Sequence, residues 1–327
     1  MTLYELNMRA GPGAQYAIIT TLDSGVGLTF EARSADFSWL LGHTVDGAFR
    51  GWVASLYLSY RDGFSAASLP VSGEVLSAAA FESPVMQRVR AAPIVATATG
   101  TAQAIFQRGL ARGNHPDRFS KVGDCQSVPS FFLAMYDRGE YRLGSEYAYL
   151  QDTISHFAGS FIRDSAAVWS GFDVYAVLDP TWANPARCAS GESPIACEYR
   201  LWQPSFVIIS LEVWRGPTAL YIDNLRQVLE FWIGHDVVPI LATKADNREQ
   251  DSSINVAIAS LAWEYDLPLW NFLMAAQPLP NYGLTDGFHL SFAQCNFDDP
   301  AAMRNAWPWR NLTALQSLDA VRRGVGG

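Results

Sequence analysis

One cysteine and a distant Asp/His pair carry the clearest chemical signal in the chain. Cys125 follows Phe119-Ser120-Lys121-Val122-Gly123-Asp124, an apolar strand pattern that ends in a glycine turn. Asp286 and His289 lie three residues apart, far downstream. A small nucleophilic side chain at a strand end, with a carboxylate and an imidazole, is the set of groups that acyl transfer needs. A helix expected over residues 128–136 would place its positive end near Cys125 and favour a thiolate.

The composition restricts the partners of this site. The 327 residues are 49% hydrophobic and 17% charged, which is enough apolar material for a large core. Lys and Arg total 23 against 32 Asp and Glu, a net charge of −9, so no basic stripe is available to bind nucleic acid. No run of 18 apolar residues occurs, so no membrane span is expected. Neutral carbohydrates and acyl compounds remain open as substrates.

Three segments are predicted from the pattern of elements. Residues 1–60 contain short strand patterns separated by Gly/Pro turns and predict a small all-β barrel. Residues 61–84 are rich in Ser, Ala and Gly and are predicted to be a linker. Residues 85–327 alternate helical and strand patterns, which predicts an α/β fold with a flavodoxin-like doubly wound parallel sheet. Ligands bind such a sheet at the carboxyl ends of its strands, where Cys125 falls.

The individual elements of the α/β segment follow from periodicity. Helices are expected over residues 101–109, 145–157, 218–232, 254–265 and 311–322, besides the one after Cys125. Strands are expected over residues 119–122, 166–169, 206–211, 237–242 and 267–270.

The four cysteines bear on the cellular compartment and on the site. Cys188 and Cys197 flank a Gly/Ser/Pro loop, which favours a disulfide and an extracytoplasmic location over two unrelated thiols. Cys295 lies six residues beyond His289, so a Cys125–Cys295 disulfide is also open, and it would disable the nucleophile. No Cys-x-x-Cys or paired His spacing accompanies these residues, so neither a metal site nor a cofactor is expected.

The N-terminus has no basic region followed by an apolar one, so no secretory signal is recognisable. The chain is therefore either cytoplasmic or a fragment that lacks its exported N-terminal part. We favour the fragment, and expect an extracellular or cell-envelope location.

The β segment resembles the bacterial Src-homology-3-like domain. The matching stretches are Leu6-Asn7-Met8-Arg9 with Gly11-Pro12, a central Trp39, and Gly51-Trp52-Val53 with Tyr57-Leu58. The resemblance spans nearly the whole segment and implies binding to cell-wall or other extracellular polymers. The alternative is that the aromatic residues fill the barrel core, which we favour for Trp52.

Residues 84–323 resemble the SGNH, or GDSL-like, hydrolases. Gly123-Asp124-Cys125 stands where that family has Gly-Asp-Ser, and Asp286-x-x-His289 matches its closing block. The stretch 238–244 is also similar to its fourth strand. The resemblance implies that Cys125 is the nucleophile, His289 the base and Asp286 the group that orients the imidazole. Ser127 is an alternative nucleophile, although its position suits packing or a hydrogen bond at the helix start better.

The chain departs from this family at two points. The nucleophile position is cysteine, which remains a competent nucleophile beside an imidazole. The oxyanion donors would be the N–H groups of Cys125 and Gly171, but the third strand ends in Ser210-Leu211-Glu212 without the expected Asn. An ionised Glu212 would repel an oxyanion, and the loss of one donor costs roughly two to three orders of magnitude in rate.

Two functions follow from these residues. The first is an esterase that acts on acylated carbohydrate or another cell-wall or extracellular polymer, and the retained Asp286 and His289 favour it. The second is a non-catalytic extracellular polymer-binding protein on a degenerate hydrolase fold, favoured by the absent serine and the absent Asn.

Overall fold

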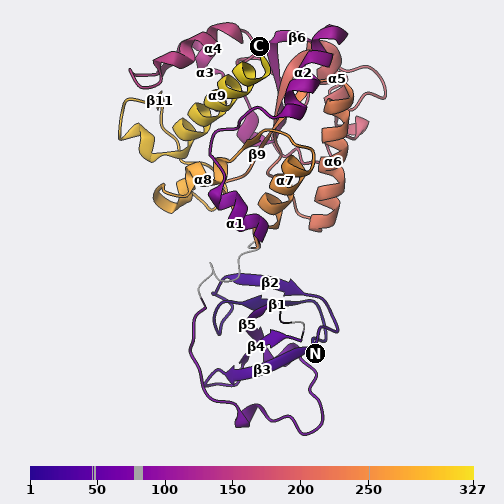
Figure 1. Ribbon diagram of the computed structural model, residues 1–327, viewed down its shortest axis with the longest axis vertical. Helices are drawn as coiled ribbons and strands as arrows, with labels where there is room; N and C mark the ends of the chain where they lie inside the picture. Colours follow the sequence, from indigo (N-terminus) through magenta and orange to yellow (C-terminus); the bar gives the residue numbers. More distant parts are fainter. Residues whose placement is uncertain (46, 48, 77–83, 250) are drawn as a thin grey trace. The chain divides into compact units, whose positions relative to one another are not determined.

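The computed structural model describes residues 1–45, 47, 49–76, 84–249 and 251–327, and these form a mixed α/β fold (Figure 1). An antiparallel sheet of five strands occupies the N-terminal part, and a parallel sheet with helices occupies the C-terminal part. The chain divides into two compact units, Met1–Gln87 with Glu249–Ser252, and Arg88–Arg248 with Ser253–Gly327. Among the described residues, no helix combines the length and the apolar character that crossing a membrane requires.

The N-terminal unit is built on antiparallel strands in the order β2-β1-β5-β4-β3. Their bounds are β1 (Leu6–Arg9), β2 (Ile18–Leu22), β3 (Leu28–Arg33), β4 (Trp39–Thr44) and β5 (Arg50–Ala54). Trp52 is fully buried, so the prediction that it fills the core is confirmed.

Residues 61–76, predicted to be the first part of a linker, pack on this sheet instead. The Trp52 indole N–H donates to the Glu74 carbonyl oxygen at 2.8 Å, and Leu76 is buried against Trp52. The Ser72 N–H donates to the Arg33 carbonyl oxygen at 2.9 Å. The apolar Leu76 and these hydrogen bonds hold the segment against the sheet. Residues 77–83 of the predicted linker lie outside the described residues.

The C-terminal unit contains a parallel sheet in the order β10-β9-β8-β6. Its strands are β6 (His115–Gly123), β8 (Pro204–Ser210), β9 (Val238–Ala242) and β10 (Leu269–Trp270). Every residue of β8 is buried, as expected of a continuous apolar run in a sheet that is covered on both faces. The strands predicted over 119–122, 206–211, 237–242 and 267–270 are thereby confirmed, with shifted ends.

Four helices pack on this sheet in two pairs (Figure 1). Helix α6 (Thr218–Gly234) connects β8 to β9 and packs against α7 (Ser253–Glu264), which connects β9 to β10. Right-handed crossovers place both on one face of the sheet. Helix α2 (Gly100–Arg112) packs against α9 (Ala306–Val325). All four were predicted, α9 from a shorter pattern.

Three predicted elements differ in the structure. The strand expected over 166–169 is a single bridge between Val168 and Gly123. The helix expected over 145–157 is a 3-10 turn, η5 (Ala148–Leu150), followed by the short α4 (Gln151–His156).

The helix expected over 128–136 is also wrong. Cys125–Ser127 is one 3-10 turn, η4, and the next helix is the four-residue α3 (Met135–Arg138). Pro129 follows Val128 and restricts it to an extended backbone (φ −66°, ψ 144°), which stops a helix at its first residue.

The remaining α-helices and β-strands are short. They are α1 (Pro84–Ala91), β7 (Tyr141–Arg142), α5 (Pro194–Trp202), α8 (Phe272–Ala276) and β11 (Cys295–Asn296). A disulfide joins Cys188 to Cys197, the second of which lies in α5, so this predicted bridge is confirmed.

Candidate active site

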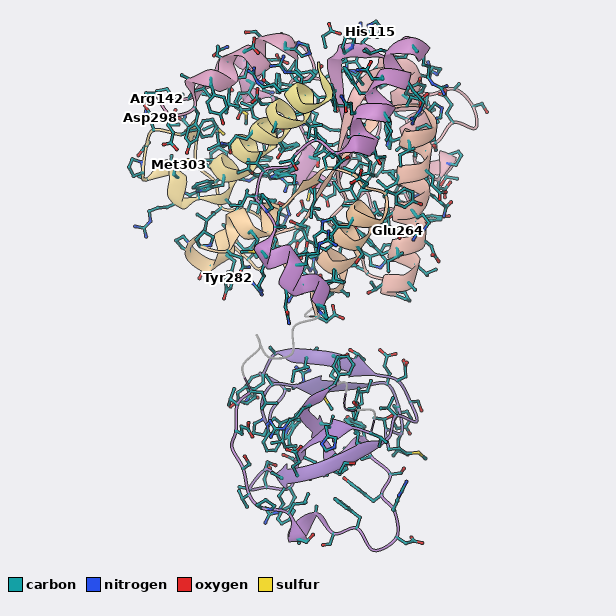
Figure 2. All side chains as sticks on the ribbon, in the orientation of Figure 1. His115, Arg142, Glu264, Tyr282, Asp298 and Met303 are labelled. Carbon is teal, nitrogen blue, oxygen red and sulfur yellow. A yellow bond between two sulfur atoms is a disulfide. The ribbon has the colours of Figure 1, made fainter. Side chains whose placement is uncertain are left out.

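The nucleophile turn, which we define as residues 124–127, begins where β6 ends. His115 marks the amino end of this strand (Figure 2) and Gly123 its carboxyl end. A Cβ atom on Gly123 would lie 2.1 Å from Ser127 Oγ and 2.6 Å from the Ser210 carbonyl oxygen. Only glycine therefore lets the turn fold this tightly against the end of β8.

Asp124 ties the turn to the strand beside it. Its Oδ1 accepts a hydrogen bond from the Gln126 N–H at 2.8 Å, which caps η4. Its Oδ2 accepts from the N–H groups of Glu212 and Val213, each at 3.0 Å. Burial, together with the nearby Glu212 carboxylate, raises the pKa of Asp124 to about 7. The residue positions the turn and does not face solvent.

The Cys125 thiol is half-buried and protonated at neutral pH. Burial raises its pKa to about 11, and the Asp124 and Glu212 carboxylates add to the rise. The expectation of a thiolate is therefore wrong. The turn is a single 3-10 turn, so no helix dipole acts on Cys125, and the nearest charges include two carboxylates.

Asp286 and His289 form a hydrogen-bonded pair on the base loop, which we define as residues 284–290. Asp286 Oδ2 lies 2.6 Å from His289 Nδ1, and Oδ1 accepts from the N–H groups of Phe288 (3.0 Å) and His289 (2.7 Å). The hydrogen bond to His289 lowers the pKa of Asp286 to about 2. An ionised Asp286 accepts from Nδ1–H, which in the neutral imidazole leaves Nε2 as the acceptor, and Nε2 makes no hydrogen bond within the described chain. The two side chains are 55% and 61% exposed.

One hydrogen bond joins the base loop to the nucleophile turn. Gln126 Nε2 donates to the Phe288 carbonyl oxygen at 3.3 Å, across 162 residues of sequence. The residues next to Cys125 and to His289 are therefore in direct contact. No hydrogen bond links Cys125 Sγ itself to His289 in the part of the chain that the structure describes.

Gly171 lies close to the same strand end. It is the third residue of a turn in which the Phe172 N–H donates to the Trp169 carbonyl oxygen, and its φ of +94° favours glycine. The Trp169 N–H donates to the Gly123 carbonyl oxygen at 3.3 Å, which holds this turn beside β6. Gly171 is exposed, and its N–H makes no hydrogen bond within the described residues.

Glu212 forms an ion pair with Arg310, a residue that was not predicted to belong to the site. Arg310 Nη2 lies 2.6 Å from Glu212 Oε1, and both side chains are fully buried. Arg310 also donates from Nε to the Gln126 carbonyl oxygen at 3.3 Å and from Nη2 to Ser210 Oγ at 2.7 Å. The guanidinium lies 5.0–6.0 Å from the centroids of four aromatic rings, Phe132, Trp270, Phe272 and Trp307. The arginine charge therefore offsets the repulsion that was expected between Glu212 and an oxyanion.

A signal for Arg310 was present in the sequence. It is a lone basic residue between the aromatic Trp307-Pro308-Trp309 and the apolar Leu312 of a buried helix. A charge in such a position requires a buried partner, but periodicity does not say that the partner is Glu212.

The two remaining candidates from the sequence are Ser127 and Cys295, and both are buried. Ser127 is buried, in agreement with a packing role. Cys125 and Cys295 are both free thiols, so the Cys125–Cys295 disulfide is not formed. Cys295 is held in β11 by pairing with Tyr141 of β7, and its sulfur accepts a hydrogen bond from Asn311 Nδ2 at 3.5 Å.

The β7–β11 pair is closed at its edge by an ion pair. Arg142 Nη2 lies 2.7 Å from Asp298 Oδ1, and the two residues are adjacent in Figure 2.

Within the described residues, no group of three or more His, Cys, Asp or Glu side chains is arranged to hold a metal ion. No protein-family model matches the chain, and no curated protein sequence matches it.

Proposed function

We propose that the C-terminal unit is an ester hydrolase of the SGNH type that removes acyl groups from carbohydrate or another cell-wall or extracellular polymer. The observation that carries the proposal is the Asp286–His289 pair, with Nε2 unbonded, on a loop that is hydrogen-bonded to the nucleophile turn. This arrangement supplies a base, a group that orients it and a thiol in neighbouring segments.

The raised pKa of Cys125 decides how the reaction would proceed. The thiol must lose its proton during the attack, as a serine hydroxyl would, rather than react as a preformed thiolate. His289 Nε2 accepts that proton while Sγ bonds to the ester carbonyl carbon. The carbonyl C=O becomes a C–O⁻ single bond, and the N–H groups of Cys125 and Gly171 stabilise this oxyanion.

The second half of the reaction returns the groups to their starting state. The imidazolium of His289 gives its proton to the departing alkoxide, which leaves as an alcohol, and Cys125 retains the acyl group as a thioester. Water then attacks the thioester as His289 takes its proton, and the carboxylic acid and the free thiol are released. Asp286, with a pKa of about 2, stays ionised and fixes the imidazole tautomer throughout.

The location and the role of the N-terminal unit belong to the same proposal. The Cys188–Cys197 disulfide supports an extracellular or cell-envelope location. The five-stranded antiparallel sheet supports a bacterial Src-homology-3-like barrel that binds the polymer.

The test is the hydrolysis of 4-nitrophenyl acetate and acetylated xylan by matched variants. His289→Ala is expected to lower kcat/KM by about 10²–10⁴-fold, because general base catalysis is lost. His156→Ala, which removes a half-buried imidazole elsewhere in the same unit, is expected to leave kcat/KM unchanged. Cys125→Ala is expected to abolish turnover and Cys295→Ala to preserve it. Equal rates for His289→Ala and His156→Ala would refute the proposal.

The second candidate is a non-catalytic polymer-binding protein on a degenerate hydrolase fold. The absence of a Cys125–His289 hydrogen bond among the described residues, together with the raised pKa of Cys125, favours it. It predicts that the unaltered protein hydrolyses neither ester but still sediments with insoluble polymer.

A further inference from the structure

A pocket of about 240 Å³ lies next to the segment that leads to Gly171. Its walls include three aromatic side chains, Trp169, Phe172 and Trp182. Trp169 is 65% exposed and Trp182 is 55% exposed. Two tryptophans this accessible around one concavity mark an interaction site rather than core packing.

The aromatic walls suit the C–H groups of a sugar ring. Phe172 and Trp182 meet edge to face, with centroids 6.3 Å apart and planes at 84°. This contact fixes the orientation of Trp182 although the side chain is half-exposed. The faces of aromatic rings carry negative charge and attract the weakly positive C–H groups of a pyranose face.

The polar wall of the pocket is almost neutral. Arg187 Nη1 lies 3.6 Å from Asp164 Oδ2, and Nη2 donates to the Asp164 carbonyl oxygen at 2.8 Å. The two charges offset each other, so neither an anion nor a cation is preferred. Asn184 Oδ1 accepts from the Ala186 N–H at 2.9 Å, while Asn184 Nδ2 makes no hydrogen bond within the described chain. Donors and acceptors side by side are what hydroxyl groups require.

The pocket adjoins the strand end that carries Cys125. Val168 pairs with Gly123, and the Trp169 N–H donates to the Gly123 carbonyl oxygen. Gly171, the proposed oxyanion donor, lies between the lining residues Trp169 and Phe172. The volume is below the roughly 300–1,000 Å³ of pockets for larger ligands, and therefore suits a single ring.

We infer that this pocket is a subsite for one neutral sugar ring, and that the substrate of the proposed hydrolase is a neutral acylated polysaccharide. The substrate assignment rests on the proposed function, whereas binding of the sugar requires no chemistry at Cys125. Because Trp169 lines the pocket and its N–H donates to the Gly123 carbonyl oxygen, a ring bound there lies beside the end of β6.

The test measures binding of xylopentaose, cellopentaose and chitopentaose to the full chain by calorimetry. At least one of the three is expected to bind with a millimolar or lower Kd, and Cys125→Ala is expected to bind it equally well. Trp182→Ala and Trp169→Ala are each expected to weaken binding at least tenfold, and Trp182→Phe less. Tyr149→Ala removes an aromatic side chain that is 52% exposed elsewhere in the same unit, and is expected to leave Kd within twofold.

Two results would overturn the inference: no binding of any of the three oligosaccharides, or binding that both tryptophan variants leave unchanged. Measurements of hydrolysis distinguish a failure of the sugar-subsite inference from a failure of the proposed function. Trp182→Ala is expected to lower kcat/KM for acetylated xylan and to preserve the rate on 4-nitrophenyl acetate. If the proposed function fails, neither ester is hydrolysed, yet the oligosaccharide still binds.

Discussion

Cys125 stands beside carboxylates instead of at a helix start, and this neighbourhood sets its reactivity. Because its pKa is raised to about 11, alkylation by iodoacetamide is expected to be slow at pH 7. The rate should rise about tenfold per pH unit between pH 7 and pH 10, as the thiolate fraction grows. Peptide mass spectrometry, read at the Cys125 peptide, measures this rate. An alkylation rate that stops rising below pH 8 would show that the pKa of Cys125 is not raised.

Asp286 makes stability depend on pH at the acid end. Its pKa is lowered from 3.8 to about 2 in the folded protein, so its contribution is present above the unfolded value and is lost as pH falls from about 4 to about 2. Asp286→Asn removes this contribution. Urea unfolding at pH 6 and at pH 2.5 is expected to show a smaller difference between the variant and the unaltered protein at the lower pH.

Ester hydrolysis tests the orienting role of Asp286, and Asp298→Asn is the matched control because Asp298 is also a surface carboxylate in an ion pair. Only Asp286→Asn is expected to lower ester hydrolysis. Equal losses of hydrolysis in both variants would argue against the orienting role of Asp286.

At the scale of elements, Arg310 joins α9 to the ends of β6 and β8. Arg310→Met leaves Glu212 buried without its partner and is expected to lower the free energy of unfolding by about 3–5 kcal/mol. The double variant Arg310→Met/Glu212→Gln removes both charges and is expected to recover part of that loss. Urea unfolding at pH 7 measures both. A double variant no more stable than the single one would show that the ion pair is not what stabilises this junction.

The sequence correctly predicts those helices and strands that form from their own residues without a distant partner. The apolar run of β8 and the 3.6-residue periodicity of α6 need no distant partner to be recognised. The helix expected after Cys125 failed because Pro129 outweighs the apolar residues that follow it. The strand expected near Val168 failed because only one bridge to Gly123 forms.

The candidate site likewise combines a local contact that spacing predicts with long-range contacts that it does not predict. The Asp286–His289 contact spans three residues, so spacing alone predicts it. The Glu212–Arg310 pair joins residues 98 positions apart, and no local pattern indicates which residues the fold brings together. The low thiolate content of Cys125 depends on that same packing, which is why a helix-dipole argument gave the wrong sign.

At the scale of the whole molecule, the disulfide links stability to the cellular compartment. Cys188 and Cys197 are 9 residues apart, and closing a loop of this length stabilises the folded chain by about 2–3 kcal/mol. Urea unfolding of the C-terminal unit, followed in the full chain, is expected to shift by that amount when dithiothreitol is added. A Cys188→Ala/Cys197→Ala variant should be insensitive to the reductant. Equal sensitivity in both proteins would point to another cause.

The hydrogen bonds around the nucleophile turn also determine when the site can exist during synthesis. Gln126 contacts Phe288 across 162 residues and Arg310 across 184 residues. A ribosome adds residues at about 5–20 per second, and domains tend to fold as units as they emerge. The nascent chain therefore carries an incomplete site, with Glu212 lacking its counter-charge, until α9 leaves the exit tunnel.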